Sequence, residues 1–172
     1  MTASLWLTAV QALADAWSST TGYRAAASSD SDPVTVFVGA QVDDENIPTG
    51  GTGYVVVGYG GTPERPAASG SFRQTRGPMA SSHPRDEVAQ IRVRCVAQPG
   101  DGDIVAAATA AEGYLHDLES LLTTNPTLGI SAPSSRRFVA ELDGAGSWVL
   151  QQTSGGPLAM VDATVTYTAR LG

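Results

Sequence analysis

The chain has 172 residues, ten basic residues that are all arginine, and a formal net charge of −7. This length favours a single domain, and the acidic balance argues against non-specific DNA binding, because such binding depends on cations that displace counterions. The one cysteine, Cys95, excludes an internal disulfide bond and a cysteine-rich zinc site.

The apolar residues are numerous but small. They make up 42% of the chain, yet 25 of them are alanine, and 19 glycines and 10 prolines indicate long loops. We therefore expect a lean core, which favours burial of some apolar surface against another copy. No run reaches the length of a membrane span, and the N-terminus lacks the basic and apolar regions of a signal peptide. We expect a soluble protein that is not marked for export.

Residues 3–18 have the apolar spacing of an amphipathic helix. One stripe contains two tryptophans, a pattern more typical of a packed core than of a ligand site, and its members are Trp6, Val10, Leu13 and Trp17. Gly22 is expected to end this helix, and the small residues 25–32 are typical of a linker.

Two strands are predicted next. Residues 34–41 alternate, with one face formed by Val34, Val36 and Val38 and the other by Thr35 and Phe37. Residues 54–59 are apolar on both sides, as in a strand within a sheet. The acidic triplet Asp43–Glu45 lies in the intervening loop. Three consecutive carboxylates cannot all face one ion, and calcium ligands are spaced at alternate positions, so a solvated loop is favoured over a calcium site.

Residues 60–85 are rich in glycine, proline, serine and arginine, and they predict a long loop with a short strand at 72–76. Loops of this length in compact domains are usually functional or disordered. Two interpretations stay open: a solvated, mobile loop, and an arm that contacts a partner. The loop concentrates the arginines of an otherwise acidic chain, namely Arg65, Arg73, Arg76 and Arg85.

Residues 86–98 predict a long strand that forms a hairpin with residues 72–76. Its inward face is expected to hold Ile91, Val93, Cys95 and Ala97. Its outward face carries Gln90, Arg92, Arg94 and Gln98, which form wet surface or meet acidic residues of a neighbour. The residues that we predict to contact a partner or another copy are Arg73, Arg76, Arg85, Arg92 and Arg94.

The stretch from Asp101 to Gly129 predicts a long helix that covers the sheet. Asp101 or Asp103 is suited to cap its N-terminus, and Asn125-Pro126 is expected to stop it. Its apolar face is formed by Ile104, Ala107, Ala108, Ala111, Leu115, Leu118 and Leu122, and its polar face by Thr109, Glu112, His116, Glu119 and Thr123.

Three strands are predicted after this helix, at residues 138–142, 148–153 and 159–171, with turns at 143–146 and 154–157. The last strand alternates strictly over a dozen residues. The expected order is a helix, two strands, a looped hairpin, a helix and a three-strand meander, with no internal repeat, all in a single domain over residues 1–172.

Patterns that carry chemistry are missing from the sequence. A phosphate-binding loop needs a lysine, and the chain has none. Ser82 and His83 are adjacent in a loop, but no nucleophile-elbow motif surrounds a serine. His116 is expected to pair with a glutamate on the helix surface. We expect no catalytic residue, no metal ligand and no cofactor, and therefore no enzyme.

The order of elements and several short phrases resemble the tail terminator (tail completion) proteins of long-tailed bacteriophages, especially those that infect actinobacteria. The resemblance covers nearly the whole chain. It rests on the strand phrases Val36–Gly39 and Val55–Tyr59, on the helix end Leu121–Gly129, and on Gln151–Thr153 followed by the alternating strand that closes on Tyr167–Leu171.

This resemblance implies an α+β fold, a mixed β-sheet covered by two α-helices with a long-loop or β-hairpin excursion. It also implies a ring, a homohexamer, that caps the head-proximal end of the tail tube in the virion, ends tube polymerisation and joins the tail to the neck. The implied partners are other copies, the tail tube protein and a head-completion or stopper protein, while viral DNA passes through an acidic lumen. Alternatives are another neck component, such as a connector or stopper, or the tube protein itself. A hydrolase that uses Ser82 and His83 is the third hypothesis.

Overall fold

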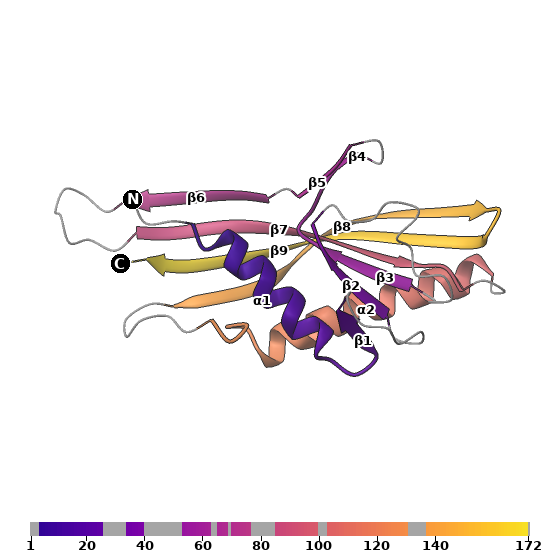
Figure 1. Cartoon of the computed structure of the whole chain (residues 1–172), viewed down its shortest axis with the longest axis horizontal. Coiled ribbons are helices and arrows are strands. Elements are labelled where there is room, and N and C mark those ends of the chain that lie inside the picture. The colour runs from indigo at the N-terminus through magenta and orange to yellow at the C-terminus, as the bar shows by residue number, and fades with distance from the viewer. Residues whose placement is uncertain are drawn as a thin grey trace.

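The computed structural model describes residues 4–25, 34–39, 53–62, 65–68, 70–76, 85–99, 103–130 and 137–171. In these ranges the chain forms an α+β fold in which two helices lie on a mixed sheet (Figure 1). The elements in chain order are α1 (Trp6–Ser18), β1 (Tyr23–Ala25), β2 (Val34–Val38), β3 (Gly53–Val57), β4 (Tyr59–Thr62), β5 (Arg65–Ala68), β6 (Gly70–Arg76), β7 (Arg85–Ala97), α2 (Ile104–Thr124), β8 (Phe138–Thr153) and β9 (Gly156–Leu171).

The main sheet has seven strands. Six of them lie in the order β1-β2-β3-β7-β9-β8, and the seventh, β6, pairs with the same edge of β7 as β3 does. Strands β1, β2 and β3 are parallel, whereas β3, β6 and β9 are each antiparallel to β7, and β8 is antiparallel to β9. One edge of β7 pairs with β9 along residues 85–97. The other edge is divided, with residues 85–91 paired to β6 and residues 93–97 paired to β3. The predicted hairpin between residues 72–76 and the long strand is confirmed.

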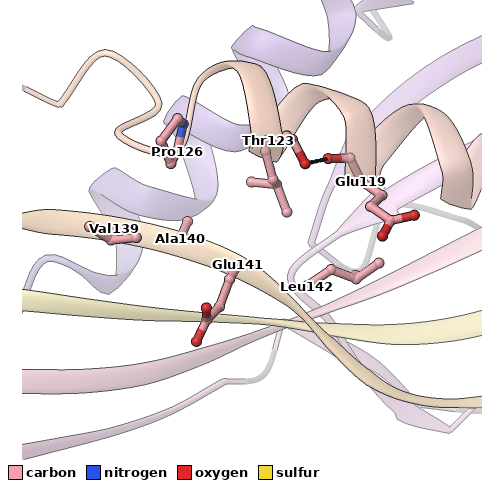
Figure 2. Close-up of a pocket in the computed structure, with 8 residues that line it drawn as sticks. Glu119, Thr123, Pro126, Val139, Ala140, Glu141 and Leu142 are labelled. Carbon is pink, nitrogen blue, oxygen red and sulfur yellow. Dashed lines mark hydrogen bonds between the residues drawn. The ribbon is translucent and has the colours of Figure 1, made fainter.

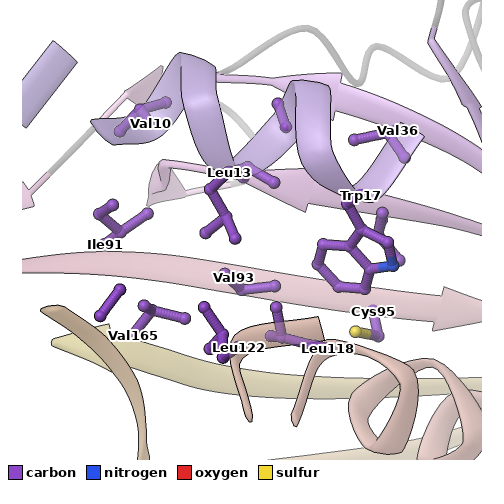
Figure 3. Packing of buried hydrophobic residues seen from close by; sticks show 14 of the residues in the cluster. Val10, Leu13, Trp17, Val36, Ile91, Val93, Cys95, Leu118, Leu122 and Val165 are labelled. Atoms are coloured by element: carbon purple, nitrogen blue, oxygen red, sulfur yellow. The ribbon is translucent and has the colours of Figure 1, made fainter. Parts of the chain in front are cut away.

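Both helices cover one face of this sheet. The alternating positions of β7 and β9 that point to this face are buried, and they share a single core with the apolar faces of α1 and α2. Figure 3 shows this core around β7, with the labelled side chains Val10, Leu13 and Trp17 from α1 and Leu118 and Leu122 from α2 near Ile91, Val93 and Cys95. The predicted inward faces of both helices and of the strand 86–98 are confirmed.

The ends of α2 follow from its capping residues. The Oδ1 atom of Asp103 accepts a hydrogen bond from the backbone N–H of Ala106 at 2.8 Å, which satisfies one of the free donors of the first turn. At the other end the helix stops at Thr124, just before Asn125-Pro126, because the residue before a proline avoids helical geometry. The N-cap residue is therefore Asp103, whereas Asp101 lies outside the described residues.

The C-terminal part of the chain differs from the prediction. The expected turn at 143–146 is wrong, because β8 runs without reversal from Phe138 to Thr153. Leu142 pairs with Val165 and Gly146 pairs with Ala163, so β8 has two more residues than β9 over this interval, which form an irregularity in the strand. The glycine-rich segment 143–146 forms a bulge within β8. The predicted three-strand meander is therefore a two-stranded hairpin that turns at Ser154 and Gly155.

Three other short strands were not predicted. Strand β1 lies at the start of the predicted linker, and β4 and β5 form a separate two-stranded sheet within the predicted loop 60–85. The acidic triplet Asp43–Glu45 and the Ser82-His83 pair lie outside the described residues. Within the described ranges, no helix combines the length and hydropathy needed to cross a bilayer.

Candidate interaction surface

Side chains capable of chemistry are dispersed over the described residues. No group of three or more histidine, cysteine, aspartate or glutamate side chains lies close enough there to hold a metal ion. His116 is exposed on α2, with its Nδ1 atom 3.8 Å from Glu119, as expected of a surface pair. Cys95 is buried, and burial together with the nearby Asp162 raises the pKa of its thiol, which keeps the sulfur protonated and unreactive.

The buried polar centre of the fold is Glu87 on β7, whose exposed fraction is 0%. Its Oε1 atom accepts hydrogen bonds from the Tyr167 hydroxyl at 2.6 Å, the backbone N–H of Leu5 at 3.0 Å and the Ser4 hydroxyl at 3.1 Å. Its Oε2 atom accepts one from Nε2 of Gln74 at 2.6 Å. One carboxylate thus joins the start of α1, the edge strand β6 and the strand β9.

The edge strand β8 carries an apolar patch that the sequence had not suggested. We use the name β8 patch for Trp148, Val149 and Leu150, whose exposed fractions are 46%, 46% and 52%. Trp148 and Leu150 lie opposite Val161 and Ala159 of β9, and Val149 lies opposite Met160, so the patch has side chains on both faces of the strand. Contiguous exposed apolar residues on a strand edge mark a protein interaction site.

The surroundings of the β8 patch carry no charge. From residue 144 to residue 161, between Asp143 and Asp162, the sequence contains no arginine, lysine, aspartate or glutamate. These residues form the whole hairpin end of β8 and β9. In a chain with a net charge of −7, this hairpin is a region where two copies can approach without bringing like charges together.

The N-terminal half of β8 borders an open groove of about 330 Å³ between the strand and α2. Figure 2 shows Glu119 and Thr123 of α2 on one side and Ala140, Glu141 and Leu142 of β8 on the other. The lining residues include no basic side chain, and the side chain of Glu141 points away from α2 (Figure 2). Its composition suits an apolar or basic segment from outside rather than a small anionic ligand.

The opposite free edge of the antiparallel region is β6, which pairs with β7 alone among the described strands. Arg73 is exposed there, opposite Val88 of β7. Arg76 of β6 and Arg85 of β7 lie opposite each other in the strand register, at the end of the same ladder. The structure thus places three of the five predicted contact arginines on the β6–β7 hairpin.

The other two arginines lie on the face of β7 opposite the helices. Arg92 is exposed opposite Thr164. Arg94 forms a two-point ion pair with Asp162, with Nε–Oδ1 and Nη2–Oδ2 distances of 2.6 and 2.7 Å. This geometry holds the guanidinium on its own sheet, so Arg94 acts first as a link between β7 and β9.

The β8 patch and Glu87 are the residues that sequence reasoning missed. For Glu87 a signal was present, because it has the same parity as Ile91, Val93 and Cys95 on the buried face of β7. The β8 patch gave no comparable signal, because a strand with apolar residues on both sides is equally expected inside a sheet.

A comparison with protein-family models found no match for this chain, and a comparison with curated proteins found none either.

Proposed function

We propose that this chain is a structural virion protein that caps the head-proximal end of a phage tail tube as a ring. In this role it ends tube polymerisation and joins the tail to the head-neck complex, with no catalytic step and no cofactor. The proposal combines the sequence resemblance with one structural observation, a four-stranded antiparallel unit. Its two outer strands have no further partner among the described strands, and they carry opposite charges.

The four strands of this unit are β6, β7, β9 and β8 in that order, and each strand is antiparallel to its neighbour. Strand β8 therefore runs opposite to β6. If a second copy is placed beside the first by rotation, its β6 meets the first copy's β8 in antiparallel orientation, and the sheet continues. A contact of this head-to-tail kind closes into a ring when the rotation per copy divides a full turn.

Charge supports the same pairing. Strand β6 carries Arg73 and Arg76, whereas the first half of β8 carries Glu141 and Asp143. Arg73 and Glu141 are both exposed and lie on the face of the sheet opposite the helices. Oppositely charged edges favour β6 against β8 over pairing of either edge with itself.

The acidic balance is consistent with a passage for DNA. A wall without a net positive charge releases few counterions from the phosphates, so DNA passes without sequence-specific binding. The implied partners are the tail tube protein on one side of the ring and a head-completion or stopper protein on the other.

A charge exchange tests this proposal. The variants Arg73→Glu and Glu141→Arg should each weaken association of the purified protein, and the double variant should restore it, as measured by native mass spectrometry and negative-stain images with and without tail tubes. Glu112→Arg is the matched control, because Glu112 is an exposed acidic residue of α2 and belongs to neither edge strand. Wild-type monomers that never bind tube ends would contradict the proposal. Long tubes formed by the protein alone would favour a tube protein instead.

A further inference from the structure

One end of the main sheet is rich in arginine. Figure 1 shows that β6 and β9 end there and that β7 and β8 begin there. We use the name basic end for four neighbouring stretches, which are residues 73–76, 85–88, 137–139 and 168–171. They contain five arginines and two carboxylates, which give a formal charge of +3. Because the whole chain has a charge of −7, the other residues together carry −10. The basic end is therefore a positive region on an acidic molecule.

The two carboxylates of the basic end do not occupy its arginines. Glu87 is fully buried, and its oxygens accept hydrogen bonds from four uncharged donors. The Oδ1 atom of Asp86 lies 3.8 Å from Nε of Arg170, which is longer than a hydrogen bond. Among the ion pairs of the described residues, none includes Arg73 or Arg137. The guanidinium groups of Arg137 and Arg170 therefore keep donors for a group from outside.

Arg137 and Arg170 lie directly opposite each other on neighbouring strands. The backbone N–H of Arg170 donates a hydrogen bond to the carbonyl oxygen of Arg137 at 3.0 Å, and both residues are exposed. Like charges in this position destabilise a sheet, and a carboxylate between them would remove the repulsion and accept hydrogen bonds from both. The two arginines border a hollow of about 410 Å³, whose other lining residues are Asp86, Glu87, Val88, Thr168 and Ala169.

The hollow also has an apolar side. Val88 is 45% exposed and lies opposite Thr168, which in turn lies opposite the partly exposed Val139. Phosphate groups of DNA would gain nothing from these methyl groups and would be repelled by Asp86 and by the acidic remainder of the chain. A peptide with a carboxylate beside an apolar side chain matches both parts of the hollow.

We propose that the basic end binds an acidic segment of another protein, with a carboxylate between Arg137 and Arg170 and an apolar side chain on Val88. For the source of this segment the inference rests on the proposed ring. In that ring the adjacent copy places β6 beside β8, and β6 contains two arginines and no carboxylate. The acidic segment therefore comes from outside the ring, from a tail or neck protein.

Peptide binding tests this site. The full chain is titrated into a fluorescein-labelled peptide, Ser-Glu-Leu-Glu-Val-Glu-Ser, in about 0.15 M salt, and fluorescence anisotropy reports binding. The matched peptide has glutamine in place of each glutamate. We expect saturable binding of the acidic peptide and binding of the glutamine peptide that is weaker by about tenfold or more.

Substitution identifies the arginines that bind. Arg137→Gln/Arg170→Gln should weaken binding of the acidic peptide by about tenfold or more. Arg92→Gln is the matched control, because Arg92 is exposed on the same face but lies level with Thr164, about 20 Å from Arg170 along β9. This distance exceeds the screening length of the buffer, so the control should change the affinity by less than about twofold.

Methyl NMR spectra of the wild-type protein place the bound peptide without any substitution. The methyl signals of Val88 should shift on addition of the acidic peptide. Those of Val105, an exposed valine of α2, should stay unchanged. If circular dichroism shows that the double arginine variant is not folded, this measurement decides.

Three results would overturn the inference while leaving the proposed ring in place. The first is a wild-type protein that binds both peptides equally or neither. The second is a folded double arginine variant that binds the acidic peptide like the wild type, or a Val88 signal that does not move. The third is displacement of the peptide by an equal concentration of duplex DNA, which would assign the site to phosphate groups. Failure of the proposed ring has a different signature, since the wild-type protein would then remain monomeric in native mass spectra whether or not it binds the peptide.

Discussion

The hydroxyl of Tyr167 donates a hydrogen bond of 2.6 Å to the carboxylate of Glu87, and both side chains are fully buried. The two residues lie on adjacent strands, and Glu87 also accepts bonds from the first residues of α1 and from β6. All four of its partners donate, so the two carboxylate oxygens of Glu87 are the common acceptors of these hydrogen bonds. This pair fixes the start of α1 and the edge strand β6 to the same point.

Removal of this acceptor is predicted to destabilise the protein strongly. Glu87→Ala should lower the free energy of unfolding by about 3 kcal/mol or more, because several buried donors lose their acceptor at once. Urea denaturation monitored by circular dichroism measures this change. Thr168→Ala, an exposed position next to Tyr167, is the control and should change stability by less than about 0.5 kcal/mol. Equal stability of both variants would contradict a structural role for the carboxylate.

Two glycines are predicted to respond to alanine with opposite signs. A Cβ atom at Gly53 would lie 2.5 Å from the Tyr114 hydroxyl and 2.5 Å from the carbonyl oxygen of Val96, so Gly53→Ala should destabilise the fold by about 1–3 kcal/mol. A Cβ atom at Gly113 in α2 meets nothing within 4 Å, and Gly113→Ala should stabilise it by about 0.5–1 kcal/mol. Thermal unfolding of the two variants checks this pair, and a shift in the same direction for both would count against the described approach of α2 to β3.

Alkaline titration should reveal two protected tyrosines. Burial raises the pKa of Tyr167 above its ordinary value, with the nearby Glu87 as a second cause, and burial raises that of Tyr23, whose hydroxyl donates to Asp117 at 2.7 Å. Because the folded state favours the neutral phenols, their contribution to stability is complete below a pH of about 10 and is lost as the pH rises further toward the raised values.

The measurement is the absorbance of tyrosinate as a function of pH. Tyr167→Phe and Tyr23→Phe should each remove absorbance from the late transition that accompanies unfolding. Loss of absorbance from the early transition, near a pH of about 10, would show that the phenol concerned titrates as a solvated group.

The elements that the sequence predicted well are those whose local signals agree with their packing. The strict alternation of β9 and the capped, one-sided pattern of α2 each place their apolar residues against the same core, so a local pattern was sufficient. The pairing of β7 with β6 was also predicted, because a hairpin joins two strands that are neighbours in the sequence.

The features that the sequence did not predict depend on contacts between distant segments. Asp143–Gly146 has the composition of a turn, but a continuous partner in β9 holds it as a bulge. In the sequence, Glu87 is a polar residue near the end of a strand. Its burial depends on hydrogen-bond donors from Ser4 and Tyr167, which are distant in sequence. The parallel pairing of β1, β2 and β3 likewise has no local signature.

The irregularity between Leu142 and Gly146 has a consequence for solubility. Strand β8 spans 16 residues, and an unbroken outer ladder of that length, with tryptophan, valine and leucine exposed, would serve as a template for open-ended growth of amyloid-like fibres. The bulge bends the strand and divides its outer row of hydrogen-bonding groups into two short segments that are out of step. A straight strand added from a foreign chain can match only one of them at a time, so indiscriminate stacking ends after a few residues.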